Sequence, residues 1–85
     1  MVSVKTQYTV RRDFVAPDGD PDVEHLGSFR NEADAVEFAR QKSAFRSGEF
    51  AVTRFELCWM DETHEWEVVD VAPLTVCVGG EEVQS

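Results

Sequence analysis

Two histidines and two cysteines are the residues best suited to metal or nucleophile chemistry: His25, His64, Cys58 and Cys77. A structural zinc site needs about four such ligands in short paired spacings. The two cysteines are 19 positions apart, and His64 follows Cys58 by six, so neither pair has such a spacing. We therefore predict two free thiols, no metal, no cofactor and no catalytic residue. A Cys58–His64 nucleophile pair is the minor alternative.

Carboxylates are far more abundant than any other group with chemical potential. Asp18-x-Asp20-x-Asp22 has the spacing that opens a calcium-binding loop. Val23 then stands where that loop needs glycine, and Phe29 stands where it needs the bidentate glutamate. A turn rich in proline, aspartate and glycine is the better interpretation of this segment, and a weak calcium site is the alternative.

The acidic residues are unevenly distributed along the 85 residues. The chain has 17 acids and 8 bases, for a net charge of −9, with −5 in residues 13–29 and −8 in residues 49–85. Two acidic centres result. The loop centre contains Asp13, Asp18, Asp20, Asp22 and Glu24. The hairpin centre contains Glu56, Asp61, Glu62, Glu65, Glu67 and Asp70. We predict that the hairpin centre, together with Asp18, Asp20 and Asp22, binds a partner.

The composition excludes several classes of protein. A charge of −9 repels phosphate, so we expect neither direct binding of nucleic acid nor binding to an acidic membrane. No apolar run approaches the roughly 20 residues of a membrane span, and the first ten residues lack a basic segment followed by an apolar run, so we expect no signal peptide. These features predict a cytoplasmic protein. Apolar residues make up 42% of the chain, which is too many for a disordered acidic tail.

The acidic centres must be positioned by a small sheet and one helix. Apolar and polar residues alternate with a period of two over residues 3–12 and 50–60, which predicts strands there, with a returning strand at 65–71. A short strand or extended piece is expected at 24–29, and a last strand at 74–78 is an option. Asn31 has the character of a helix N-cap, and an amphipathic pattern follows it over residues 31–46.

These elements predict an α+β fold, an antiparallel sheet of four to five strands in the order β-β-α-β-β, with a further C-terminal strand as an option and one helix packed on one face. Residues 1–80 form a single domain and residues 81–85 a flexible tail.

The segments 50–60 and 65–71 are the most distinct hairpin in the chain. Their alternation predicts that Trp59 faces Trp66, Leu57 faces Val68 and Phe55 faces Asp70. We expect the aromatic face of this hairpin to lie under the helix. The opposite face then carries acids with apolar residues nearby, namely Glu56, Glu65, Glu67, Cys58, Met60, Val52, Val69 and Val71.

An acidic face with an apolar centre is suited to a basic groove on another protein, such as a groove that otherwise holds nucleic acid. The contact would use either the 13–24 loop or the 56–70 hairpin, and the sequence leaves this choice open. Three alternatives remain: a solvated surface that promotes solubility, a homo-oligomeric structural domain such as a homodimer that pairs across a sheet edge, and a small metal protein or enzyme.

The overall profile resembles the anti-CRISPR proteins of phages and mobile elements. The features on which this resemblance depends are the length of 85 residues, the charge of −9, Gly27-Ser28-Phe29 leading into the Asn31 helix, and Glu65-Trp66-Glu67-Val68-Val69. The resemblance implies an inhibitor in the host cytoplasm that occupies a nucleic-acid or subunit-docking surface of a CRISPR effector. These families share no common motif, so the resemblance assigns no role to any particular residue.

Overall fold

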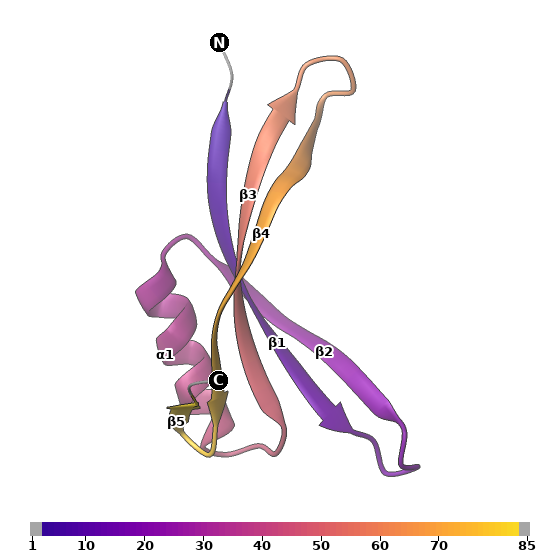
Figure 1. Ribbon diagram of the computed structural model, residues 1–85, viewed down its shortest axis with the longest axis vertical. Helices are drawn as coiled ribbons and strands as arrows, with labels where there is room; N and C mark the ends of the chain where they lie inside the picture. The colour runs from indigo at the N-terminus through magenta and orange to yellow at the C-terminus, as the bar shows by residue number, and fades with distance from the viewer. Residues whose placement is uncertain (1–2, 84–85) are drawn as a thin grey trace.

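The computed structural model describes residues 3–83 and shows a twisted sheet with one helix against it (Figure 1). The elements in chain order are β1 (Val4–Val15), β2 (Pro21–Phe29), α1 (Glu32–Ser43), β3 (Glu49–Met60), β4 (Glu65–Val78) and β5 (Glu81–Val83). All neighbouring strands are antiparallel, in the order β2-β1-β3-β4-β5. The predicted α+β class is confirmed.

The helix begins where its capping residue predicts. The Asn31 side chain accepts a hydrogen bond from the Asp34 amide at 2.9 Å, as an N-cap does. The helix ends at Ser43, three residues before the predicted end at 46. The Ser43 hydroxyl donates to the Arg40 carbonyl and accepts from the Gly80 amide, both at 2.9 Å. Ser43 therefore connects the end of α1 to the β4–β5 turn.

The hydrophobic core lies between α1 and one half of the sheet. Its fully buried members are Val10, Ala35, Ala39, Phe50, Val52 and Cys77. The helix thus covers the face of β3 that carries Phe50 and Val52, and the expectation that it covers Phe55 and its alternating neighbours is wrong. The apolar residues of β3 change face between Val52 and Phe55, so Phe55 and its alternating neighbours project from the side of the sheet opposite the helix.

Several strand assignments differ from expectation. β1 continues to Val15 and β2 begins at Pro21, so the predicted 13–24 loop is a strand at both ends and a turn only in its middle. Residues 74–78 continue β4 without a break instead of forming a separate strand. Residues 81–83, expected in the tail, form β5 and pair with Val76–Val78, while residues 84–85 lie outside the described residues. Gly79 and Gly80 make this possible, because both have positive φ (62° and 87°), as a tight two-residue hairpin turn requires.

Two hairpins extend beyond the part of the sheet that α1 covers (Figure 1). The β3–β4 arm, defined as residues 54–71, extends upward in Figure 1 beside the start of β1. The β1–β2 arm, defined as residues 11–25, extends in the opposite direction, down and to the right. The molecule is correspondingly elongated, with extents of 46 × 29 × 20 Å. In residues 3–83 no helix has the length and apolarity needed to cross a membrane.

Candidate functional site

The β3–β4 arm has the predicted register near its tip. Trp59 faces Trp66 and Leu57 faces Val68, and the two indole rings meet edge to face with centroids 5.5 Å apart. One additional residue, Val69, then forms a β-bulge in β4. A bulge inserts one residue into one strand and so changes which residues beyond it share a face.

The bulge corrects the predicted pairing of Asp70. Beyond Val69, Asp70 lies opposite Glu56, and Val71 lies opposite Phe55. The predicted Phe55–Asp70 pair is therefore wrong. Because directly opposed residues share a face, the bulge moves Asp70 to the same side of the sheet as Glu56 and moves Val71 to the side of Phe55.

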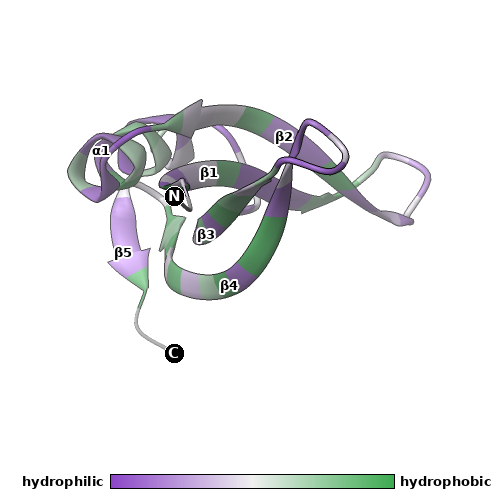
Figure 2. Cartoon of the chain, turned by 90° about the horizontal axis from the view of Figure 1, so that it is seen from above, coloured by the Kyte–Doolittle hydropathy of each residue, from purple (hydrophilic) through white to green (hydrophobic). Residues whose placement is uncertain are grey.

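The arm consequently has two faces of different chemistry, and hydrophobic and hydrophilic residues alternate along its strands in Figure 2. We call one the acidic face; its carboxylates are Glu56, Glu65, Glu67 and Asp70. We call the other the apolar face; it carries Phe55, Leu57, Trp59, Trp66, Val68 and Val71. The helix covers neither face beyond the row of Arg54 and Ala72.

The expected apolar centre of the acidic face is partly wrong. Val52 belongs to the core and is 1% exposed, and Val71 lies on the apolar face. Met60 does lie on the acidic face, together with Cys58 and, on β1, Val4. These residues lie toward the tip, so the acidic face is carboxylate-rich throughout and partly apolar near its end.

The remaining acids of the hairpin centre lie in the exposed turn at its tip. Asp61 and Glu62 are the first two residues of this turn, which runs from 61 to 64. His64 has a left-handed backbone (φ 56°), and its amide donates to the Met60 carbonyl at 2.8 Å. All six predicted hairpin acids therefore belong to one arm, four on a single face and two at the tip.

None of these six carboxylates forms an ion pair within the described residues. The ion pairs there are Arg11–Asp13 at 3.2 Å, Arg40–Glu37 at 2.6 Å and Arg46–Glu24 at 2.8 Å. The charge of the β3–β4 arm is thus not compensated by contact with any cation of that part of the chain.

Two cations lie near the arm without pairing to its acids. Lys5 lies on the opposite face, where its Nζ is 4.3 Å from the centroid of the Trp66 ring. Arg54 lies on the acidic side next to Glu56 in β3, and its buried Nε has no hydrogen-bond partner. Among residues 3–83, the acidic face therefore has one unpaired cation at its inner border and none toward the tip.

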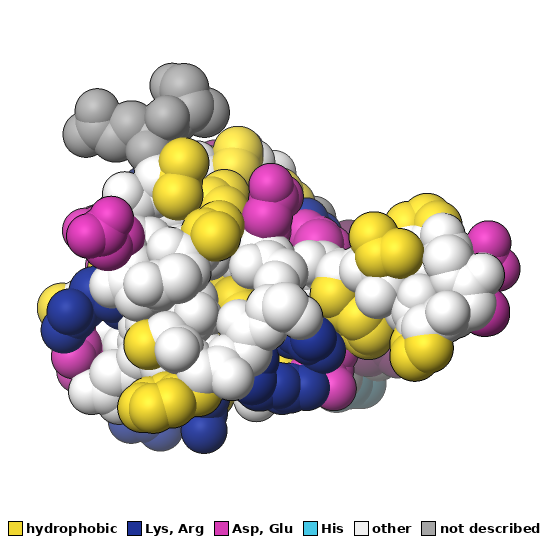
Figure 3. Space-filling view, turned by 90° about the horizontal axis from the view of Figure 1, so that it is seen from below, with side chains coloured by type: hydrophobic (Ala, Val, Ile, Leu, Met, Phe, Trp, Pro, Cys, Tyr) yellow, Lys and Arg dark blue, Asp and Glu magenta, His cyan; other side chains and the backbone are white. Residues whose placement is uncertain are grey.

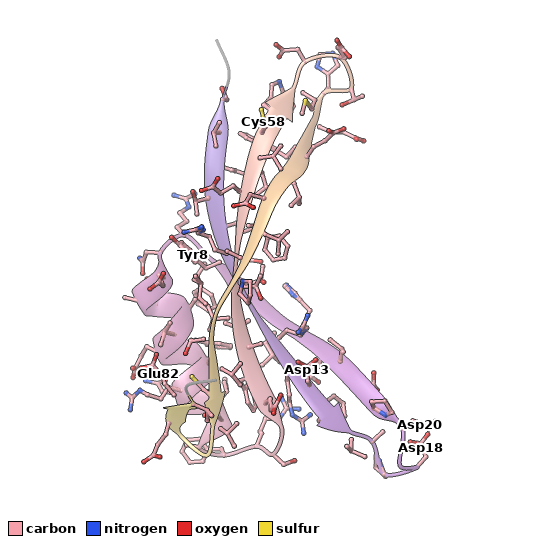
Figure 4. All side chains as sticks on the ribbon, in the orientation of Figure 1. Tyr8, Asp13, Asp18, Asp20, Cys58 and Glu82 are labelled. Carbon is pink, nitrogen blue, oxygen red and sulfur yellow. The ribbon has the colours of Figure 1, made fainter. Side chains whose placement is uncertain are left out.

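The other predicted binding acids lie in a different region. Asp18 and Asp20 are at the tip of the β1–β2 arm, at the opposite end of the molecule from Cys58 of the β3–β4 arm (Figure 4). Asp18 accepts a hydrogen bond from the Asp20 amide at 3.1 Å, and Asp22 accepts one from the Val23 amide at 2.8 Å. The Asp18 and Asp22 carboxylates thus bond to backbone amides of their own hairpin, and the structure brings none of the three aspartates to the acidic face.

Seen from below, the β1–β2 arm carries acidic side chains at its far end and basic ones where it leaves the body (Figure 3). Arg12 is one of the first residues of this arm; its Nε donates to the Ser47 carbonyl at 2.7 Å, and its guanidinium lies 4.0 Å from the Phe14 ring centroid. Arg12 therefore connects the root of this arm to the segment that precedes β3.

The histidines and cysteines do not converge on a common site. Cys58 is half-buried on the acidic face, whereas Cys77 is buried under α1, and both thiols are free. Burial raises the pKa of the Cys77 thiol above its ordinary value, and the charge of Glu82 adds to this effect. His64 contacts Trp59 edge-on at 6.4 Å between centroids. Across residues 3–83, no three metal-ligating side chains gather.

Sequence reasoning predicted the aromatic residues of the apolar face but missed that the helix leaves them uncovered, and it missed the bulge that adds Val71 to this face. The signal was present, since Glu65 to Val68 alternates strictly and Val69 then repeats an apolar residue before the alternation resumes at Asp70. Two consecutive apolar residues within a strict period of two are the pattern that one inserted residue produces.

No family model, curated protein or solved structure matches the chain. The geometry of the two arms is therefore the basis on which a function is argued.

Proposed function

We propose that the protein is a non-enzymatic binding protein that inhibits its partner by placing the β3–β4 arm in a basic, nucleic-acid-binding groove. The observation that carries the proposal is the set of six carboxylates on this arm, none of which forms an ion pair within the described residues. A cytoplasmic location accompanies the proposal. The resemblance to anti-CRISPR proteins suggests a CRISPR effector as one partner of this kind.

The spacing of the acidic face supports contact with several cations at once. Neighbouring strands lie about 4.8 Å apart, and alternate residues of one strand lie about 6.8 Å apart. Glu56 and Asp70 are direct cross-strand neighbours, and Glu67 and Glu65 continue the same row of β4 toward the tip. Arginine side chains lining a groove can therefore meet successive carboxylates along the arm, as they would meet successive phosphates.

Uncompensated charge also affects how fast such a partner is found. Complementary potentials accelerate encounter and lose this effect as salt screens them over roughly 10 Å at 0.1 M ionic strength. The acids of the β1–β2 arm contribute less to this attraction, because Asp13 and Glu24 already contact arginines. The proposal thus assigns recognition to the β3–β4 arm.

A pair of charge-matched variants tests the proposal. Glu56→Lys with Glu67→Lys changes the acidic face, and Asp18→Lys with Asp20→Lys makes the same change of charge on the β1–β2 arm. Titration calorimetry with a nona-arginine peptide at low salt should show binding about tenfold weaker for the first variant and within about threefold of wild type for the second. Circular dichroism checks that both remain folded.

Equal losses in the two variants would contradict the proposal, because they would show that only net charge matters. A wild-type protein that does not bind the peptide even at low salt would also contradict it.

One observation favours a second candidate, the homo-oligomeric structural domain. Trp66, Val68 and Val71 are 37%, 51% and 51% exposed on the apolar face, and neighbouring exposed apolar side chains are typical of an interaction surface. Sedimentation equilibrium over a concentration series decides this: a self-associating species that dissociates in Val68→Lys supports the oligomer, and a strict monomer removes it.

A further inference from the structure

The outer edge of β4 is open along the β3–β4 arm. The short strand β5 pairs only with Val76–Val78, at the far end of β4. Every residue from 65 to 71 is exposed, and among the described elements β4 contacts only β3, β5 and α1. The backbone of this segment therefore has a strand neighbour on one side only.

The direction of the free backbone groups follows from one hydrogen bond. The Trp59 amide donates to the Ser3 carbonyl at 2.9 Å, on the β1 side of β3. In an antiparallel ladder, a residue that bonds to one neighbour does not exchange bonds with the other. Trp66, the partner of Trp59, thus directs its N–H and C=O away from β3. Val68 is two residues further along β4, opposite Leu57, so its N–H and C=O also point away from β3.

The two sides of this edge differ in chemistry. Glu65 and Glu67 project on the acidic face, and Trp66 and Val68 project on the apolar face. A strand added at this edge would have its own side chains beside these two sets, because side chains of neighbouring strands on one face contact one another. Opposite charges on one face and apolar side chains on the other would complement both sets.

We propose that the open edge of β4 between the tip and the Val69 bulge accepts an extended basic segment of a partner protein as an added strand. This segment alternates Lys or Arg with apolar residues. Its cations lie beside Glu65 and Glu67, its apolar residues lie beside Trp66 and Val68, and its backbone bonds to the free groups of Trp66 and Val68. The inference rests on the proposed function and specifies the form in which the basic partner binds.

The charge of the edge selects a basic strand over a second copy of this chain. Pairing β4 with its own copy would bring the carboxylates of both copies onto one face, and like charges on neighbouring strands are destabilising. Each copy also carries a net charge of −9. Charged residues and a bulge are features that prevent edge strands from pairing with themselves. The same carboxylates attract a strand of opposite charge.

The test uses peptides that differ only in order or in backbone chemistry. The probe is a capped heptapeptide that alternates lysine and valine. One control has the same composition with all lysines first, and a second is the alternating peptide N-methylated at every second residue. We expect the alternating peptide to bind at least about tenfold more tightly than either control. We also expect it to slow hydrogen exchange of the Trp66 and Val68 amides.

A substitution in the protein tests the same edge without changing its charge. Val68→Pro removes an outward amide, and proline is tolerated at such edge positions because the lost donor is not part of the ladder. It should weaken the alternating peptide at least about tenfold, whereas Val68→Thr, which keeps the amide and changes only the side-chain contact, should weaken it much less. If Val68→Pro unfolds, the N-methylated peptide carries the test.

The outcomes separate this inference from the proposed function. Equal affinities for the three peptides, with no protection of Trp66 and Val68, would overturn strand addition. If Glu56→Lys with Glu67→Lys still weakened nona-arginine in that case, recognition by the acidic face would stand and only the strand-addition model would fall. If neither the alternating peptide nor nona-arginine bound, both would fall.

Discussion

The two arms of the sheet carry similar numbers of acids but differ in how those acids are compensated. In the β1–β2 arm, Asp13 contacts Arg11 and Glu24 contacts Arg46. In the β3–β4 arm, no carboxylate has an ion pair within the described residues. Both segments are acidic in the sequence, so local net charge does not identify the face that is free to bind.

The direction of the helix explains the difference. The first turn of α1 is acidic and the last turn is basic, with Arg40 and Lys42, as the helix dipole favours. The helix begins near the crossing point of the sheet and runs away from the β3–β4 arm (Figure 1). Its basic end and the following Arg46 therefore lie on the side of the β1–β2 arm, where Arg46 reaches Glu24.

The largest effect is expected where both arms join the core. Phe50 is fully buried beneath α1, and Phe50→Ala should lower the free energy of unfolding by about 3–5 kcal/mol because it leaves a cavity. Val68→Ala, on the exposed part of the β3–β4 arm, should lower it by less than about 1 kcal/mol. Urea denaturation measures both. Similar losses would show that the arm packs as tightly as the core.

A smaller effect is expected when the ion pairs of the β1–β2 arm are removed, because its carboxylates then become as uncompensated as those of the β3–β4 arm. Arg11→Gln with Arg46→Gln removes the cations that contact Asp13 and Glu24, so the β1–β2 arm should become a second site for nona-arginine. Calorimetry should show that the variant binds nona-arginine about threefold more tightly than the wild type. The free energy of unfolding should change by no more than about 1 kcal/mol, because the two ion pairs are exposed. Unchanged binding would mean that ion pairing does not distinguish the arms.

The smallest effect concerns pH and the two cysteines, one in the core and one on the β3–β4 arm. The pKa of the Cys77 thiol is raised in the folded state, so the unfolded chain loses this proton first. The associated stability is complete below the ordinary pKa of 9.0 and is lost as pH rises through the folded value. Urea midpoints below and above pH 9.0 should show this loss, and Cys77→Ala should remove it. A slope that Cys77→Ala leaves unchanged would contradict this assignment.

The sequence predicts the features that depend on local patterns. Alternation gives the α+β class and the Trp59–Trp66 register, and Asn31 gives the helix start. The apolar residues of β3 supply both faces of the sheet, and the face that α1 covers depends on the side on which the helix packs, which is a tertiary property. The ion pair between Arg46 and Glu24 joins residues 22 positions apart, so it also requires the fold.

The sequence predicts which acidic residues lie on the β3–β4 hairpin, but it does not predict how they are arranged on its faces. The six hairpin acids do belong to one arm, but Asp70 shares a face with Glu56 only because of the bulge at Val69. Asp18 and Asp20 were grouped with these acids by charge alone, and the hairpin turn between β1 and β2 places them at the other end of the molecule.

The most direct test of the central claim is an amide chemical-shift titration of the labelled protein with nona-arginine. The account predicts that shifts concentrate on residues 56–70 of the β3–β4 arm, diminish with added salt, and leave residues 13–24 nearly unchanged. Shifts that are equal on the two arms, or larger on residues 13–24, would contradict it.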